Sequence, residues 1–156
     1  MATVTIYTDG SCRANGTPNS RGAWAAILCC GEREKQLVGG EAPSTNQRME
    51  LMAAIAGLEA LRSSCQVTLV TDSQYVKNGI TTWIKNWKRS GWISSKKQPV
   101  VNRDLWERLD SVVSKHTVTW EWVKGHAVDD MNNRVNDLAQ AFSALSIEKP
   151  LATNET

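Results

Sequence analysis

The chain has 156 residues, of which 41% are hydrophobic and 22% are charged, and this composition predicts one soluble globular domain. It contains no apolar run of about 18 residues, which excludes a membrane-spanning helix, and its start does not resemble a signal peptide. The four cysteines match neither a zinc site nor a disulfide framework, so we expect reduced thiols in a cytoplasmic protein.

The first predicted elements are strands of a meander. Apolar and polar residues alternate over residues 3–9, which predicts a strand, and a loop rich in Gly, Asn and Pro follows at residues 10–22. Further strands fit residues 23–30 and about 34–38, joined by a turn at Gly31. We therefore expect three antiparallel strands at the start of the chain.

Helices and strands alternate in the rest of the chain. A helix with Ser, Thr and Asn as candidate caps is expected at about residues 44–62, followed by a short apolar strand at 67–71. A strand that is reached through a helix implies a parallel crossover. Helical pieces then lead to a helix near residues 102–114, a strand at 117–123 and a last helix at about 130–145. This order predicts a mixed-sheet α/β domain.

Three acidic residues occupy positions that the predicted fold brings together. Asp9 ends the first strand, Asp72 follows the fourth strand, and Glu50 lies in the first turns of the long helix. If the two strands are parallel neighbours, their carboxyl ends share the sheet edge where such sheets bind ligands. Close carboxylates repel one another, and an all-oxygen cluster favours Mg²⁺ or Mn²⁺ over zinc. Each acid alone would be explained as a turn cap or a surface charge, so the metal-site hypothesis depends on all three.

Four segments closely resemble bacterial ribonuclease H of type I: Thr8–Ser11, Asn46–Leu51, Thr71–Val76 and Val123–His126. The likeness runs from about residue 4 to residue 145. It implies an α/β fold with a five-stranded mixed sheet flanked by helices. It also implies metal-dependent endonucleolytic cleavage of the RNA strand of RNA–DNA hybrids, with 5′-phosphate and 3′-hydroxyl products.

The same resemblance assigns roles to the acidic residues and to one histidine. Asp9, Glu50 and Asp72 correspond to three of the family's four metal ligands. Two Mg²⁺ ions, or Mn²⁺ in their place, would activate the attacking water and stabilise the leaving 3′-oxygen. His126 follows the last strand and would assist proton handling or product release, which suits an imidazole pKa of about 6.5. His116 has no such context and is expected at the surface.

The last helix departs from the family pattern. The family has an acid two residues before a Leu-Ala pair, and Leu138–Ala139 places Asn136 at that position. Asn136 is therefore the expected fourth catalytic and metal-binding residue, with an amide oxygen in place of a carboxylate. Asp137 is rotated by about 100° along the helix and should point away, while Asp129 and Asp130 should face solvent at the helix start. We expect weaker binding at one metal position.

A basic segment follows the third acid. Between residues 73 and 103 the chain has no Asp or Glu but seven Lys or Arg residues, which indicates a polyanionic partner rather than a solvated basic face. The segment resembles the family's basic protrusion, at about residues 80–99, which grips the DNA strand. The expected contacts here are Trp83, Lys85, Trp87, Lys88, Arg89, Trp92, Lys96 and Lys97. The spacing of Trp83 and Trp87 also permits packing onto the body, and we expect at least one tryptophan to be structural.

Five polar residues are further contacts that the resemblance implies. Asn15 and Thr45 would hold a DNA phosphate, and Asn46, Gln47 and Gln74 would lie near the minor groove. Each of them would otherwise be explained as a helix cap or a turn former. The loop around Asn15 lacks the family's glycine-rich run, which leaves its placement open.

The working hypothesis is a cytoplasmic, monomeric ribonuclease H with a catalytic domain at residues 1–146 and a flexible tail at residues 147–156. Its partner is the RNA–DNA hybrid duplex, with no membrane or protein partner. One alternative is a catalytically weak or inactive hybrid-binding protein, because Asn136 replaces an acid. A second is a nuclease of the same fold that acts on DNA, against which the Lys124–His126 context and the basic segment argue.

Overall fold

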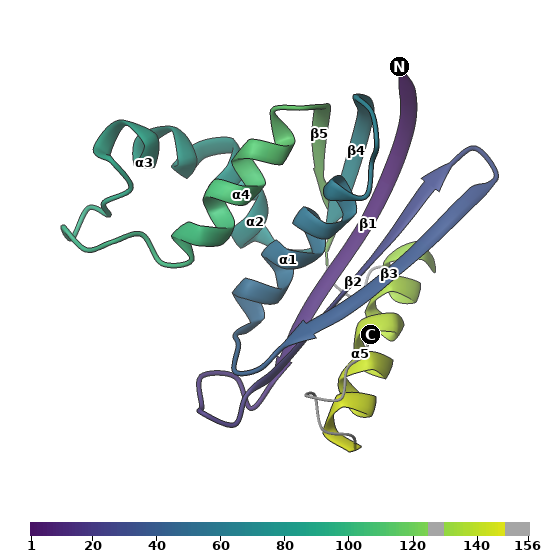
Figure 1. Ribbon diagram of the computed structural model, residues 1–156, viewed down its shortest axis with the longest axis horizontal. Coiled ribbons are helices and arrows are strands. Elements are labelled where there is room, and N and C mark those ends of the chain that lie inside the picture. The colour runs from purple at the N-terminus through teal and green to yellow at the C-terminus, as the bar shows by residue number, and fades with distance from the viewer. Residues whose placement is uncertain (125–129, 149–156) are drawn as a thin grey trace.

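Five strands form one mixed sheet with the order β3-β2-β1-β4-β5. The strands are β1 (Ala2–Arg13), β2 (Arg21–Cys30), β3 (Arg33–Glu41), β4 (Cys65–Thr71) and β5 (Thr117–Trp122). β1 pairs antiparallel with β2 and β2 with β3, whereas β1 with β4 and β4 with β5 are parallel. The computed structural model describes residues 1–124 and 130–148, with residues 143–148 described by their backbone. The predicted five-stranded mixed sheet is confirmed (Figure 1).

Helices cover both faces of this sheet. They are α1 (Asn46–Glu59), α2 (Gln74–Asn78), the π-helical turn η1 (Gly79–Trp83), α3 (Ile84–Ser90), α4 (Arg103–Val113) and α5 (Asp130–Glu148). α1 packs on β1 and β2 and also against α4, while α5 packs on the opposite face against β1, β2 and β3 (Figure 1). In the described part of the chain, no helix is long and apolar enough to cross a membrane.

The inner strand β2 shows how the core is divided between the two faces. Ala26 and Leu28 belong to the core cluster beneath α1, whereas Ala25 and Ile27 pack with Val135 of α5. A strand that is covered on both faces reads as an almost continuous apolar run. The sequence therefore predicted the strand but not which helix each side chain would meet.

Aromatic side chains anchor the basic segment to the body. The segment from η1 to residue 102 projects away from the sheet (Figure 1). The Trp87 ring lies with its centroid 5.3 Å from that of Trp106 on α4 and 6.2 Å from that of Trp92. A Cβ at Gly79 would lie 2.0 Å from Cη2 of Trp106, so η1 can approach α4 only because this residue is glycine.

Several element boundaries differ from the prediction by a few residues, and two of these differences change how a segment is interpreted. β1 continues through residues 10–13, which we placed in a loop, because these residues pair with residues 21–24 of β2. The turn-forming residues are thus confined to residues 14–20. At the other end, α5 includes residues 147 and 148, which we placed in the tail, and residues 149–156 lie outside the described residues.

Candidate active site

The parallel pairing of β1 with β4 brings two acidic residues to one edge of the sheet. The parallel pairing of β1 with β4 ends where Tyr7 lies opposite Val70. Asp9 and Asp72 each follow two residues later, Asp9 within β1 and Asp72 just beyond β4. The indole Nε1 of Trp122 donates to the backbone oxygen of Asp72 at 3.1 Å and fixes the chain just beyond β4. The sequence prediction that these acids share an edge is borne out by this pairing.

Glu50 reaches the same edge because α1 lies directly against β1. A Cβ on Gly10 would lie 2.3 Å from the carbonyl carbon of Met49 and 2.5 Å from the nitrogen of Glu50. Only glycine permits this approach of helix backbone to strand backbone. Thr45 caps the start of α1, and its side-chain oxygen accepts a hydrogen bond from the Arg48 N–H at 3.1 Å. The cap and the glycine together set the position of Glu50.

The three carboxylates form one oxygen cluster. Asp9, Glu50 and Asp72 each offer one oxygen, and these oxygens all lie within 4.8 Å of one another. Asp9 is only 4% exposed. Oε1 of Glu50 and Oδ1 of Asp72 are buried and have no hydrogen-bond partner in the described part of the protein. Buried carboxylate oxygens without a partner are costly, and a hard divalent cation satisfies them.

The electrostatics of the cluster favour uptake of positive charge. Burial, followed by the charge of Asp72, raises the pKa of Asp9 from 3.8 to about 7, although hydrogen bonds from Asn136 and Gly10 oppose the shift. Burial first, and then the charges of Asp9 and Asp72, raise the pKa of Glu50 well above its usual value. Without a metal ion the cluster therefore retains protons near neutral pH, and a divalent cation would displace them.

Asn136 joins this cluster from α5, on the other face of the sheet. Its Nδ2 donates to Oδ2 of Asp9 at 2.8 Å. Asp137, one residue further along the helix, is exposed, and so is Asp130 at the helix start. Asp129 and His126 lie outside the described residues. The side chain that α5 brings to Asp9 is therefore the amide of Asn136.

Comparison with known proteins identifies the family of this chain. A family model described as RNase H matches residues 1–144. The chain belongs to the ribonuclease H family. It is 55% identical over 139 residues to the ribonuclease H of Alcanivorax borkumensis, covering 89% of this chain and 90% of that protein. It is 58% identical over 137 residues to the ribonuclease H of Rhodopseudomonas palustris, covering 88% of this chain and 83% of the relative.

Solved structures of the ribonuclease H fold superpose on nearly the whole chain. The crystal structure of LC9-RNase H1, described as a type 1 RNase H with the type 2 active-site motif, gives a TM-score of 0.83. The two are 28% identical over 92% of this chain and 73% of that chain. The foamy viral protease-reverse transcriptase in complex with dsDNA gives a TM-score of 0.77 at 22% identity, covering 92% of this chain and 96% of that chain, and supports the fold alone.

Around the cluster, the start of α1 gathers four of the expected nucleic-acid contacts of this ribonuclease H. Asn15 lies in the loop after β1, and its Oδ1 accepts a hydrogen bond from the Asn46 N–H at 3.0 Å. Thr45 is the helix cap, and Gln47 is exposed in the first turn. Gln74 is exposed at the start of α2, two residues after the third acid. The structure thus brings Asn15 to α1, which the sequence left open.

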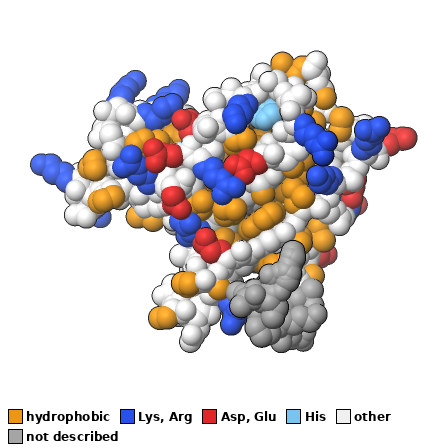
Figure 2. All heavy atoms as spheres, viewed as in Figure 1, with side chains coloured by type: hydrophobic (Ala, Val, Ile, Leu, Met, Phe, Trp, Pro, Cys, Tyr) orange, Lys and Arg blue, Asp and Glu red, His pale blue; other side chains and the backbone are white. Residues whose placement is uncertain are grey.

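The protrusion presents the expected cations to solvent. Lys and Arg side chains spread over this part of the molecule (Figure 2). Five of them are exposed: Lys85, Lys88, Arg89, Lys96 and Lys97. Lys88 also pairs with Asp110 of α4 at 3.1 Å. Trp83 and Trp87 are half-buried, and both line a hollow of about 380 Å³ on the protrusion. Each ring therefore has one part packed against the protein and another part facing a hollow that is open to solvent.

One sequence expectation is corrected here. Trp92, expected at the nucleic acid, is 9% exposed because it packs into the core beside Trp87, with the guanidinium of Arg103 5.9 Å from its ring centroid. Trp92 is therefore structural, as we expected of at least one tryptophan. His116, expected at the surface, is partly exposed beside a hollow, and its Nδ1 accepts a hydrogen bond from the Cys65 N–H at 3.0 Å. The four cysteines are free thiols, as predicted.

Arg48 was missed by the sequence analysis. It lies within the Asn46–Leu51 segment, but nothing in the sequence indicates which acids it meets. In the structure its guanidinium contacts partners on β3 and at the start of α4. The only sequence signal was an arginine in the first turn of α1, where the helix dipole disfavours a cation unless acids surround it.

Proposed function

We propose that this ribonuclease H is a metal-dependent endonuclease that hydrolyses the RNA strand of RNA–DNA hybrids and leaves 5′-phosphate and 3′-hydroxyl ends. The observation that carries the proposal is the cluster of Asp9, Glu50 and Asp72, in which two buried oxygens have no hydrogen-bond partner among the described residues. An all-oxygen set of this kind suits Mg²⁺ or Mn²⁺. The family membership supplies the reaction class, and the cluster supplies the chemistry.

The residues that would hold the metal are the three acids and the amide oxygen of Asn136. Two bound divalent ions would supply activation of the attacking water and stabilisation of the leaving 3′-oxygen. Asn136 fixes the orientation of Asp9 through its Nδ2 hydrogen bond and leaves its own oxygen for a cation. Because this side chain is neutral, the metal-free cluster is less self-repulsive than one with a fourth carboxylate, and one metal position is weaker.

Substrate binding would be divided between two surfaces. Exposed amides at the starts of α1 and α2 would contact the minor groove, and Asn15 with Thr45 would hold a phosphate. The exposed lysines and Arg89 of the protrusion would neutralise phosphates of the DNA strand, with Trp83 and Trp87 contacting sugars or bases. Recognition would follow the shape of the hybrid more than its sequence, because the contacts are mainly to the backbone. His126 would assist proton transfer or product release.

One assay tests this proposal against its alternatives. A labelled RNA–DNA duplex is incubated with the protein and Mg²⁺ or Mn²⁺, with single-stranded RNA and double-stranded DNA as controls. Cleavage of the RNA strand in the hybrid alone is the expected result. Hybrid binding without cleavage would favour a non-catalytic hybrid-binding protein, and cleavage of duplex DNA would favour a DNA nuclease.

We also propose that the enzyme is a monomer and that it is located in the cytoplasm. Its free thiols suit a reducing compartment, and we place the enzyme in the cytoplasm. A monomer carries all the residues that the proposed reaction uses, because the acids and Asn136 come from one chain. Gel filtration with light scattering measures this state, and a dimer would contradict it.

A further inference from the structure

Arg48 connects three elements through a single guanidinium group. Its Nε lies 2.9 Å from Oε1 of Glu41 at the end of β3. Nη2 and Nη1 lie 3.0 Å and 3.1 Å from the two carboxylate oxygens of Asp104 on α4, and Nη1 also donates to Oδ1 of Asn102 at 3.2 Å. The Arg48 side chain is 23% exposed. These hydrogen bonds use donors on more than one edge of the planar guanidinium group, and only arginine among the side chains has such a set of donors.

The contacts of Arg48 continue into α2, beside the third acid of the cluster. Nδ2 of Asn102 donates to Oη of Tyr75 at 3.2 Å, and Nε1 of Trp106 donates to the same oxygen at 3.1 Å. Tyr75 lies three residues after Asp72 and next to the exposed Gln74. One hydrogen-bonded network therefore runs from α1 through the start of α4 to α2.

Asn102 is the point where the protrusion rejoins the body. It has a φ of 62°, a left-handed conformation that asparagine tolerates better than most residues, and α4 begins at the next residue. Arg48 itself follows Asn46 and Gln47 and precedes Glu50 by two positions. Its guanidinium thus links the part of α1 that carries minor-groove contacts to the root of the protrusion.

We propose that Arg48 is a positioning residue that sets the spacing between the start of α1 and the basic protrusion, so that both surfaces engage one hybrid duplex. This inference rests on the proposed function. Arg48 does not reach the carboxylate cluster through any of the described hydrogen bonds, so its loss should weaken binding of the hybrid rather than the chemical step. Asp104 is 66% exposed, and pairs as exposed as this contribute little to stability. The ion pair of Arg48 with Asp104 is therefore expected to add little to the free energy of unfolding.

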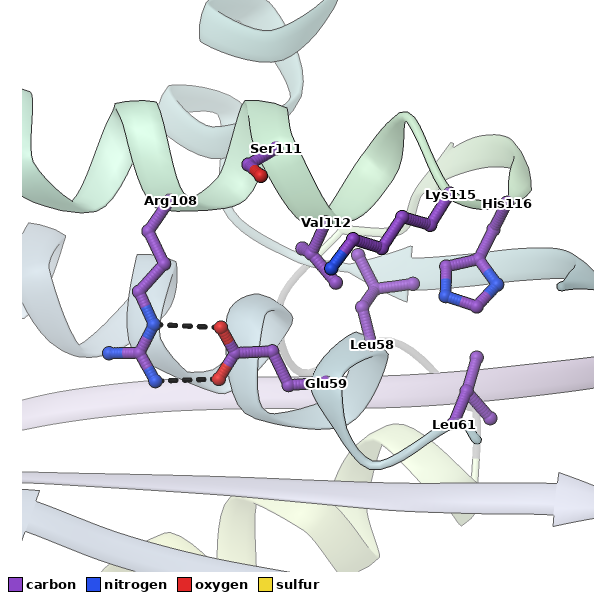
Figure 3. Close-up of a pocket in the computed structure, with 8 residues that line it drawn as sticks. All are labelled: Leu58, Glu59, Leu61, Arg108, Ser111, Val112, Lys115 and His116. Carbon is purple, nitrogen blue, oxygen red and sulfur yellow. Dashed lines mark hydrogen bonds and ion pairs between the residues drawn. The ribbon is translucent and has the colours of Figure 1, made fainter. Parts of the chain in front are cut away.

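A second ion pair between α1 and α4 provides a matched control for the contacts of Arg48. Arg108 of α4 donates two hydrogen bonds to Glu59 of α1, at 2.8 Å and 2.6 Å. This pair joins the same two helices at the opposite end of α1, beside a hollow of about 360 Å³ (Figure 3). Arg108→Gln removes an ion pair between α1 and α4 far along the helix from Asn46 and Gln47. Any effect that comes only from loosening the two helices should appear in this variant as well.

The test compares steady-state cleavage of a hybrid by the unaltered protein, Arg48→Gln and Arg108→Gln. Arg48→Gln should raise KM about tenfold and leave kcat within about twofold, whereas Arg108→Gln should change neither. Arg48→Lys should recover only part of the loss, because an ammonium cannot hold both carboxylates in the same geometry. An unchanged KM in Arg48→Gln, or an equal rise in Arg108→Gln, would overturn the proposal.

A double-mutant cycle shows whether Arg48 acts through the protrusion. Lys96→Gln with Lys97→Gln weakens the protrusion directly, and in this background Arg48→Gln should raise KM less than it does alone. Full additivity would contradict the coupling. If the unaltered protein does not cleave hybrids, the proposed function fails. Dissociation constants of the same variants for the hybrid would then still test the positioning role of Arg48.

Discussion

Replacing Asp9 by Asn should stabilise the metal-free protein while abolishing activity. Asparagine keeps nearly the same shape and can still accept the hydrogen bond from Asn136, but it removes one charge from the cluster. The pKa of Asp9 is raised from 3.8 to about 7. At about 1.4 kcal/mol for each pKa unit, this shift corresponds to about 4 kcal/mol. Burial is the largest cause of this shift, and the charge of Asp72 is the second; the variant removes both because its amide carries no charge.

The pH dependence of this effect has a definite sign. The folded protein binds the Asp9 proton more tightly than the unfolded chain does, because the folded pKa is the higher of the two. The contribution of Asp9 to the free energy of unfolding is therefore most favourable below the unfolded pKa of 3.8, and it falls as the pH rises toward about 7. The Asp9→Asn variant does not lose stability in this way, because its side-chain amide does not titrate. Its advantage should be small in acid, grow through the interval between these two pKa values, and level off above it.

Urea unfolding in the presence of EDTA measures this difference directly. At about pH 8 the variant should be more stable by up to about 4 kcal/mol, and at about pH 5 by less than half of that. Asp137→Asn is the matched control, because it removes an exposed charge next to Asn136 and should change stability by no more than about 0.5 kcal/mol. Saturating Mg²⁺ should reduce this difference in the free energy of unfolding, because it stabilises the unaltered protein more than it stabilises Asp9→Asn. If Asp9→Asn were no more stable than the unaltered protein at about pH 8 without metal, the reasoning would be refuted.

Three further predictions concern the same surfaces. Asn136→Asp should lower the metal-free stability near pH 8 and increase the rise in Tm on adding Mg²⁺, because a fourth carboxylate adds both repulsion and affinity; an unchanged Mg²⁺ response would contradict this. Gly10→Ala should cost about 1–3 kcal/mol in urea unfolding and greatly reduce kcat, since its Cβ would displace Glu50; full activity would show that the helix can shift freely. Lys96→Gln with Lys97→Gln should weaken hybrid binding and lower the slope of log Kd against log salt by up to about 2; an unaltered slope would mean that neither lysine contacts a phosphate.

The positions of the acids could be predicted because they follow from topology. The crossover through α1 sets the direction of β4, which pairs in parallel with β1. Corresponding ends of neighbouring parallel strands meet at one edge, and this pairing places Asp9 and Asp72 there. The rotation of about 100° for each helical residue separated Asn136 from Asp137, and the structure places the first on Asp9 and leaves the second exposed. Regular backbone geometry is enough for arguments of this kind.

What the sequence did not reveal depends on contacts between elements distant in the chain. The partners of Arg48 come from residues 41, 102 and 104, and no local pattern relates these positions. The burial of Trp92 was hidden because it lies in a segment rich in Lys and Arg, although its ring packs against that of Trp87. The extension of β1 was missed because turn-forming residues lie just beyond it, while pairing with β2 holds the strand to Arg13.

The most direct test of the central claim compares the unaltered protein with Glu50→Gln on an RNA–DNA hybrid labelled in its RNA strand. The unaltered protein should cleave the RNA only when Mg²⁺ or Mn²⁺ is present. Glu50→Gln should bind the hybrid with a similar dissociation constant and leave the RNA intact, because it removes a carboxylate of the cluster and no residue of the binding surface. Cleavage by both proteins at similar rates, or by neither with either ion, would contradict the assignment of this cluster as the metal-dependent active site.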